Sequence, residues 1–359
     1  MVVIGRETGR GDRPVAPLGR YRARDGSHGA RVTLDVDRPH VGLVVGKRGT
    51  GKTYTLGVLL EGLATTEGVT PVVADPMGAF GALAGSETGL NARRVDPTVR
   101  ADSLGPRQWC TVLNLAPDGG AGALVWRAAS ECATLAAMRE WVTASDADAS
   151  ARRAAANHLA LAASWGVFDP DGLGVRRLCA DEVTVLDMTG LDSEAAGAVL
   201  AAVASVLYDA RVADATDRLP WLLVDEAHAF TDGVASRPLR RLVTRGRQPG
   251  VSCWLATQRP SALPAVAVSQ ADLLVAHHLT SRADLDALSA ARPTYLTEEL
   301  ATGLPAETGT ALVVDDATES THTVRIRERE TPHGGESPRA SAVAVGRDRA
   351  SASSAANHN

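Results

Sequence analysis

The segment GKRGTGKT, residues 46–53, fits the pattern G-x-x-x-x-G-K-[ST] at every fixed position. A short apolar run precedes it and an apolar helical pattern follows, so strand, glycine loop and helix stand in the order that a phosphate-binding loop requires. In such a loop, backbone N–H groups and the helix N-terminus surround the phosphate oxygens. Lys52 would reach the β- and γ-phosphates, and Thr53 would give its hydroxyl to Mg²⁺. The predicted nucleotide-binding residues are Gly46, Gly49, Thr50, Gly51, Lys52, Thr53 and Tyr54.

Lysine occurs only at positions 47 and 52, although the chain has 37 Lys and Arg residues. A flexible ammonium suits the phosphates at position 52, whereas a planar guanidinium has a different shape and reach. Lys47 has no comparable demand on it and is interpreted as a solvated loop residue. Because no other lysine exists, a guanine-specific N-K-x-D element is excluded.

The segment WLLVDEAHAF, residues 221–230, places two acids directly after four apolar residues. Ligands of open α/β sheets bind at the carboxyl ends of the strands, where these acids should lie. Asp225 would hold the Mg²⁺ shell, and Glu226 would act as the general base for an attacking water. His228 is interpreted as a structural or interface residue. The segment VSCWLATQRP, residues 251–260, ends its strand with Gln258, whose amide could sense the γ-phosphate or orient the water.

Arginines cluster in SRPLRRLVTRGRQPG, residues 236–250, on a predicted helix and the turn that follows it. Two interpretations stay open: a surface that contacts DNA or a neighbour's nucleotide, and an ordinary solvated helix face. An arginine finger must reach a neighbouring γ-phosphate from a rigid element. Arg245 and Arg247, beside a glycine-containing turn, are the candidates.

The composition excludes several classes of protein. A net charge of −5 gives no global basic field that would attract nucleic acid. The four cysteines are far apart, which indicates reduced thiols and neither a zinc site nor a disulfide framework. We find no run of about 18 apolar residues and no signal peptide, and the helical segment 193–212 is judged too short and too alanine-rich to span a membrane. We expect a cytoplasmic protein without direct membrane insertion.

Strand patterns alternate with helical patterns, which predicts an α/β fold with a mainly parallel sheet. We expect four regions: a poorly structured N-terminal segment at 1–30, an ATPase core at 31–90 and 181–330, a mainly helical insertion at 91–180, and a disordered tail at 331–359.

These motifs together resemble the HerA/FtsK branch of P-loop ATPases, and most closely HerA-like proteins of the domain-of-unknown-function-87 kind. The loop segment, VVADPMGAF, LLVDEAHAF, TRGRQPGVSCWLATQRPSALP and VRIRERETPHGG carry the resemblance, and the block GRQPGVSCWLATQRPS is its most specific part. The resemblance implies a RecA-like fold, ATP and Mg²⁺ as cofactors, a homo-hexameric ring with ATP sites between subunits, and translocation of double-stranded DNA. In HerA itself the partner is a nuclease. HerA proteins carry a β-barrel before the loop, whereas about forty residues precede it here, which weakens the inference to DNA-end processing.

Three other functions stay open. The first is a conjugation or type IV secretion ATPase that a membrane partner recruits. The second is a nucleotide-dependent regulatory switch that hydrolyses slowly; the acidic pair and Gln258 argue against it. The third is a DEAH helicase, which the chain disfavours because we find no second motor domain.

Overall fold

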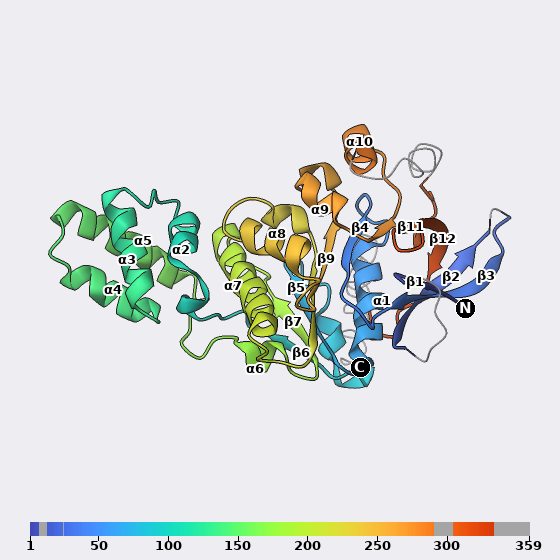
Figure 1. Cartoon of the computed structure of the whole chain (residues 1–359), viewed down its shortest axis with the longest axis horizontal. Helices are drawn as coiled ribbons and strands as arrows, with labels where there is room; N and C mark the ends of the chain where they lie inside the picture. The colour runs from blue at the N-terminus through green and yellow to red at the C-terminus, as the bar shows by residue number, and fades with distance from the viewer. Residues whose placement is uncertain (7–12, 24, 291–303, 334–359) are drawn as a thin grey trace, which may run out of the picture.

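A computed structural model describes residues 1–6, 13–23, 25–290 and 304–333. Its centre is a sheet of twelve strands in the order β1-β3-β2-β12-β11-β10-β4-β9-β8-β5-β7-β6 (Figure 1). The strands are β1 (Val2–Ile4), β2 (Val15–Arg22), β3 (His28–Asp35), β4 (Val41–Val45), β5 (Val69–Asp75), β6 (Ala92–Val95), β7 (Val183–Asp187), β8 (Leu219–Val224), β9 (Ser252–Thr257), β10 (Leu273–Ala276), β11 (Thr310–Asp315) and β12 (Ser320–Ile326). The α-helices are α1 (Lys52–Ala64), α2 (Pro106–Val112), α3 (Gly120–Glu131), α4 (Leu135–Ala144), α5 (Ala149–Ser164), α6 (Val175–Leu178), α7 (Ser193–Val212), α8 (Ser236–Arg245), α9 (Ala265–Ser269) and α10 (Arg282–Ala290).

The seven strands from β10 to β6 run parallel, as the alternation of strands and helices predicts. The other half, β11, β12, β2 and β3, pairs antiparallel, and β1 joins it parallel to β3. In the parallel half, β9 lies between β4 and β8. The residues that follow these three strands are therefore brought to one edge of the sheet.

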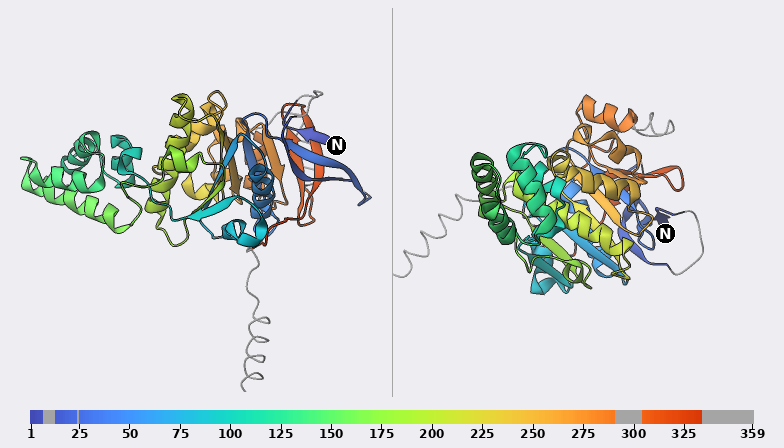
Figure 2. Two further views of the ribbon diagram at one scale, coloured as in Figure 1. Left: turned by 90° about the horizontal axis from the view of Figure 1, so that it is seen from below. Right: turned by 60° about the vertical axis from the view of Figure 1, so that its left-hand side comes forward.

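The sheet separates two hydrophobic cores. Leu43 belongs to the core on one face and Val44 to the core on the other, as expected for a strand buried on both faces. Helix α1 covers one face, and its core also contains side chains of β2 and β3. Helices α7 and α8 cover the opposite face (Figure 2). Gly42 allows this packing in β4, because a Cβ there would lie 2.2 Å from the ring of Trp254.

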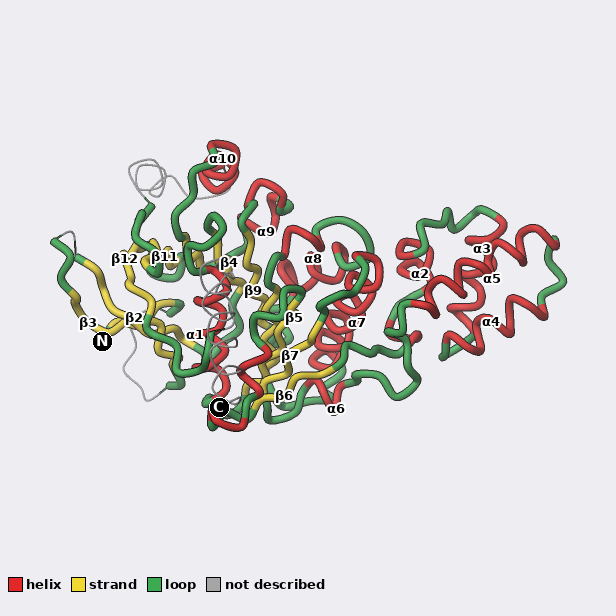
Figure 3. The backbone as a smooth tube through the Cα atoms, turned by 180° about the vertical axis from the view of Figure 1, so that it is seen from behind, coloured by secondary structure: helices red, strands yellow, loops and turns green. Residues whose placement is uncertain are grey.

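The predicted helical insertion contains α2 to α5, which pack on one another and extend beyond α7, away from the sheet (Figure 3). Trp109 anchors its base: the indole is buried, its ring centroid lies 4.7 Å from that of Phe168, and Nε1 donates to the carbonyl of Ala101 at 3.0 Å. One part of the segment 91–180 differs from the prediction. Residues 92–95 form the edge strand β6, which pairs with β7.

The N-terminal segment also differs from the prediction. We expected residues 1–30 to be poorly structured, but β1, β2 and the start of β3 lie within them. Strand β2 pairs on one side with the adjacent strand β3 and on the other with β12, about 300 residues away, and the local sequence carries no sign of the second pairing. Gly19 permits this close approach, because a Cβ there would lie 2.1 Å from the carbonyl oxygen of Arg325. The predicted disordered tail falls, from residue 334, outside the described residues.

Helix α7 is long and apolar enough to cross a membrane by length and composition, contrary to the prediction that it is too short. Its 18-residue window has a mean hydropathy of 1.5 and is 67% buried inside the fold. The helix packs against α8 and the parallel sheet, which is the arrangement of a core helix.

Candidate functional site

The phosphate-binding loop connects the end of β4 to the start of α1. Gly46 and Gly51 both have a positive φ, 157° and 118°, and Gly51 is the N-cap of α1. A Cβ on Gly46 would lie 2.6 Å from Oγ1 of Thr50 and 2.7 Å from Cβ of His277. The glycines therefore let the loop fold tightly against the helix N-terminus, whose unpaired N–H groups favour an anion.

His277, directly after β10, packs against the phosphate-binding loop and the start of α1. The ring is buried; Nδ1 lies 3.1 Å from the carbonyl oxygen of Thr310 and Nε2 lies 2.9 Å from Oγ1 of Thr55. Because a carbonyl only accepts, Nδ1 carries the proton and Nε2 accepts from the Thr55 hydroxyl. Burial lowers the pKa of His277 to about 4. The next residue, His278, accepts at its carbonyl from the backbone N–H of Lys47 at 2.8 Å. Sequence reasoning missed this support, whose sign was the polar pair HH after an apolar strand.

Lys52 is the first residue of α1 and is 6% exposed. Its Nζ donates to the carbonyl of Lys47 at 3.2 Å, so the ammonium lies inside the curve of the loop. Burial lowers the pKa of Lys52, and the charges of Glu226 and Asp225 act in the opposite direction. A positive charge in a poorly solvated position is suited to attract phosphate oxygens.

Asp225 follows β8 and contacts the loop. The Thr53 hydroxyl donates to its Oδ2 at 2.8 Å, and the carboxylate is 1% exposed. Burial raises the pKa of Asp225 to about 6, while hydrogen bonds from Thr53 and from the backbone of Glu226 oppose the shift. A hydroxyl and a carboxylate in contact are oxygen ligands of the kind that Mg²⁺ prefers. The described residues contain no group of three or more His, Cys, Asp or Glu that could hold a metal, so the remaining ligands would be phosphate and water.

Glu226 adopts a left-handed backbone conformation, with φ 48° and ψ 40°. This conformation is costly for a residue with a side chain, and such residues gather at functional sites. The side chain of Glu226 lines the same cavity as Lys52 and Thr53. His228 Nδ1 lies 3.3 Å from Oε2 of Glu226 and 3.2 Å from Oγ1 of Thr257. His228 therefore lies between the acid and the end of β9, a position next to the site that the sequence interpretation did not assign.

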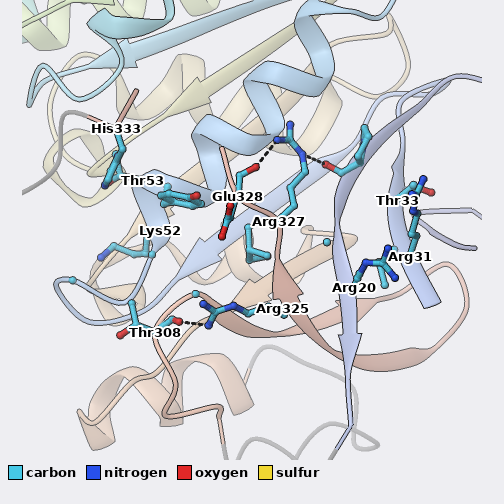
Figure 4. A pocket seen from close by; sticks show the side chains of 18 of the residues that line it. Arg20, Arg31, Thr33, Lys52, Thr53, Thr308, Arg325, Arg327, Glu328 and His333 are labelled. Carbon is cyan, nitrogen blue, oxygen red and sulfur yellow. Dashed lines mark hydrogen bonds between the residues drawn. The ribbon is translucent and has the colours of Figure 1, made fainter. Parts of the chain in front are cut away.

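The cavity has a volume of about 1690 Å³ and extends from the loop to the antiparallel half of the sheet (Figure 4). Its loop side is lined by Arg48, Gly49, Gly51, Lys52, Thr53, Tyr54 and Glu226. The opposite side includes arginines from β2, β3, β12 and the residues after β12, which are Arg20, Arg31, Arg325 and Arg327. The positive side chains make this cavity suitable for a phosphorylated ligand.

The other predicted residues lie elsewhere. Gln258 follows β9, between the loop strand and the strand of the acidic pair, and it is half-buried outside the set that lines the cavity. Arg247 forms an ion pair with Asp272 at 2.8 Å. Asp272 also accepts from the backbone N–H of Val41, the first residue of β4, at 2.7 Å. Arg247 and the nearby Arg245 at the end of α8 therefore lie at the opposite edge of the sheet from the loop, about 13 Å away along β4 alone.

Comparisons with known proteins agree with this arrangement. Residues 17–159 match the family model described as the central domain of helicase HerA. No curated protein matches the sequence. Among solved structures, VirB4 of Thermoanaerobacter pseudethanolicus superposes with a TM-score of 0.67 at 15% identity, over 89% of this chain and 97% of that chain. The plasmid coupling protein TrwB, in complex with ADP and Mg²⁺, superposes with a TM-score of 0.57 at 16% identity, over 91% of this chain and 98% of that chain.

The match to HerA and the shared fold confirm the resemblance that the motifs predict. They also confirm the predicted class of RecA-like α/β fold, with a large, mostly parallel sheet and added helices. The glycine loop, Lys52, Thr53 and the acidic pair gather at one sheet edge, so the chain carries the arrangement of a P-loop nucleotide site, and residues 17–159 are similar to the central domain of HerA.

Proposed function

We propose that this protein is an ATP-hydrolysing ring motor of the HerA/FtsK type that translocates double-stranded DNA. The observation that carries the hydrolytic part is the contact between Thr53 and Asp225, with Glu226 facing the same cavity. The family match to a helicase domain supports DNA as the polymer. TrwB, which shares the fold, was solved with ADP and Mg²⁺, which supports ATP and Mg²⁺ as cofactors here.

Each residue of the site has a separate role in ATP hydrolysis. The loop N–H groups and Lys52 bind and orient the phosphates, and the oxygens of Thr53 and Asp225 would hold Mg²⁺. When bound, the ion would act as a Lewis acid that offsets the charge of the phosphates. Glu226 takes a proton from the attacking water at its carboxylate, and His228 Nδ1 lies 3.3 Å from Oε2 of that carboxylate. Gln258 would help to align the water from the end of the neighbouring strand β9.

The position of the arginines supports assembly into a ring. Arg245 and Arg247 lie at the opposite sheet edge from their own loop, so neither can reach its own nucleotide. A finger on this segment would have to act on a neighbouring subunit, which makes the site incomplete in a single chain. A head-to-tail interface that closes gives a ring, and the resemblance to HerA implies six subunits. Arg247 is held by Asp272, whereas Arg245 is exposed and forms no ion pair with the part of the chain that is described.

The assembly is tested by mixing two inactive variants. Arg245→Ala or Arg247→Ala should bind ATP but barely hydrolyse it, and Lys52→Ala should lack turnover but offer an intact arginine to its neighbour. At equal amounts, random mixing makes about one interface in four fully intact, so turnover should pass through a maximum. Arg237→Ala, at the other end of α8, is the matched control and should be active alone. A flat line near zero, with subunit exchange verified, would contradict a shared site.

The polymer is tested by measuring ATP turnover with duplex DNA, single-stranded DNA and no DNA. The proposal expects the largest stimulation with duplex DNA, and a response that weakens as salt rises, because phosphate contacts release counterions. Equal rates in all three conditions would reject DNA translocation.

The shared fold with the conjugative coupling protein TrwB favours a second candidate, a conjugation-type ATPase that a membrane partner recruits. It predicts turnover that duplex DNA does not stimulate and that a membrane-bound partner does. A nuclease partner and a cytoplasmic location stay predictions, and co-purification from cell fractions would test both.

A further inference from the structure

The cavity is larger than the phosphate-binding loop requires. Typical small-molecule pockets measure roughly 300–1,000 Å³, and this one measures about 1690 Å³. The residues that follow β12 supply one of its walls: Arg327, Glu328 and His333 line it together with Tyr54 of α1. This wall, residues 327–333, comes from the end of the described chain, and Arg327 is its one residue among the cavity arginines named above.

A buried carboxylate fixes this segment to the loop helix. Glu61, on α1, is 3% exposed and accepts from the backbone N–H groups of Glu330 at 3.0 Å and Thr331 at 2.9 Å. The Thr331 hydroxyl donates to it at 2.6 Å, and Arg327 and Arg329 lie 2.7 and 3.6 Å from its oxygens. Burial acts to raise the pKa of Glu61, but these hydrogen bonds outweigh it and lower the pKa. A buried charge with so many partners holds the segment in one position.

The helix is shaped to receive the segment. Gly57 leaves room for the guanidinium of Arg329, because a Cβ there would lie 2.6 Å from its Cζ. The side chain of Arg329 is 1% exposed, and its backbone N–H donates to the hydroxyl of Tyr54 at 2.7 Å. The segment therefore packs along α1 in direct contact with Tyr54.

The contact brings two rings together beside the phosphate-binding loop. Tyr54 and His333 lie edge to face, with centroids 5.2 Å apart and planes at 80°. Tyr54 directly follows Thr53 and is the one Phe, Tyr or Trp among the described residues that line the cavity. A nucleotide whose phosphates lie in the loop would extend its base along the cavity walls, and a base gains most from stacking on aromatic faces.

We propose that Tyr54 and His333 form the subsite for the nucleobase and ribose of ATP, and that Glu61 is the positioning residue that holds the 327–333 segment over α1. This subsite rests on the proposed ATPase function and deepens it. Phosphates would be recognised by the loop, whereas the organic part of the nucleotide would be recognised by Tyr54 at the start of α1 and His333 after β12.

The test separates binding of the base from binding of the phosphates. Titration calorimetry with Mg²⁺ present measures the Kd of ADP and the Kd of pyrophosphate for the full chain and for Tyr54→Ala and His333→Ala. Removal of a stacking ring should weaken ADP about tenfold and leave pyrophosphate unchanged. Tyr54→Phe keeps the ring and loses only the hydroxyl, so it should bind ADP more tightly than Tyr54→Ala.

The chain offers a matched control. Tyr21 and His322 form an almost identical pair, with centroids 5.2 Å apart and planes at 78°, outside the set that lines the cavity. Tyr21→Ala should leave both Kd values unchanged. ADP binding that is unchanged in Tyr54→Ala and His333→Ala, or weakened equally in Tyr21→Ala, would overturn the subsite while the ATPase proposal stands. Equal weakening of ADP and pyrophosphate would also overturn it. A wild-type chain that binds neither ligand would reject the proposed function and this subsite with it.

Discussion

The buried His277 makes the stability of the fold sensitive to acid. Its imidazole lies between the hydroxyl of Thr55 and the carbonyl of Thr310, and burial lowers its pKa from 6.5 to about 4. Between these two pH values the unfolded chain binds a proton that the folded chain does not, so the free energy of unfolding falls as pH falls. The contribution of neutral His277 to the free energy of unfolding is complete above about pH 6.5 and is lost as pH falls toward 4.

The pKa shift of His277 sets the size of the change in the free energy of unfolding. A difference of about 2.5 pKa units, at 1.36 kcal/mol per unit, corresponds to about 3 kcal/mol in total, of which about 2 kcal/mol falls between pH 6.5 and 5.0. His277→Gln retains a polar side chain but cannot titrate. The difference in stability between the wild-type chain and this variant should therefore shrink or reverse by about 2 kcal/mol over that interval. Groups common to both chains, including Asp225, cancel in the difference.

Urea unfolding, followed by tryptophan fluorescence at several pH values, measures this difference. His158→Gln, on α5 and away from the loop, is the control and should keep the wild-type dependence. If the wild-type chain and His277→Gln lose stability in parallel from pH 6.5 to 5.0, the ring is not held neutral and the reasoning about the support of the loop is wrong.

Two further predictions concern the nucleotide. Lys52→Ala should abolish turnover and weaken ATP binding, whereas Lys47→Ala, which alters the exposed lysine of the same loop, should keep both; equal activity of the two variants would reject the assignment of the loop. Asp225→Asn should lower turnover and recover part of it at raised Mg²⁺, because concentration offsets weakened coordination; a Mg²⁺ dependence unchanged from wild type would remove Asp225 from the metal site.

The sequence predicts the elements whose signals are local. The loop and the acidic pair each combine a buried strand with polar residues at its end, and the fold brings them together because β9 separates their strands and all three run parallel. The alternation of strands and helices likewise predicts the parallel half of the sheet. The loop and the acidic pair each lie within one short stretch of the sequence.

The parts that were missed depend on distant partners. Strand β2 contains Gly19, Arg20 and Arg22, and besides its neighbour β3 it pairs with β12 from the far end of the chain. The sequence of the edge strand β6 looks polar because two of its four residues are Arg93 and Arg94. In the structure these arginines form ion pairs with Glu182, just before β7, and with Asp187 at the end of β7. Glu61 is an acid in a mostly apolar helix, and its partners lie about 270 residues away. No local pattern can show such contacts.

The central claim is that Glu226 activates water at the phosphate-binding loop. Glu226→Gln keeps the shape of the side chain and removes the base, and the matched control is Glu328→Gln, since Glu328 is the other acid among the described residues that line the cavity. ATP binding and single-turnover hydrolysis are measured for both variants at saturating Mg²⁺. The account predicts that Glu226→Gln binds ATP as the wild-type chain does and hydrolyses it at least ~10²-fold more slowly, with Glu328→Gln close to wild type. A decrease of less than a few-fold in Glu226→Gln would contradict it.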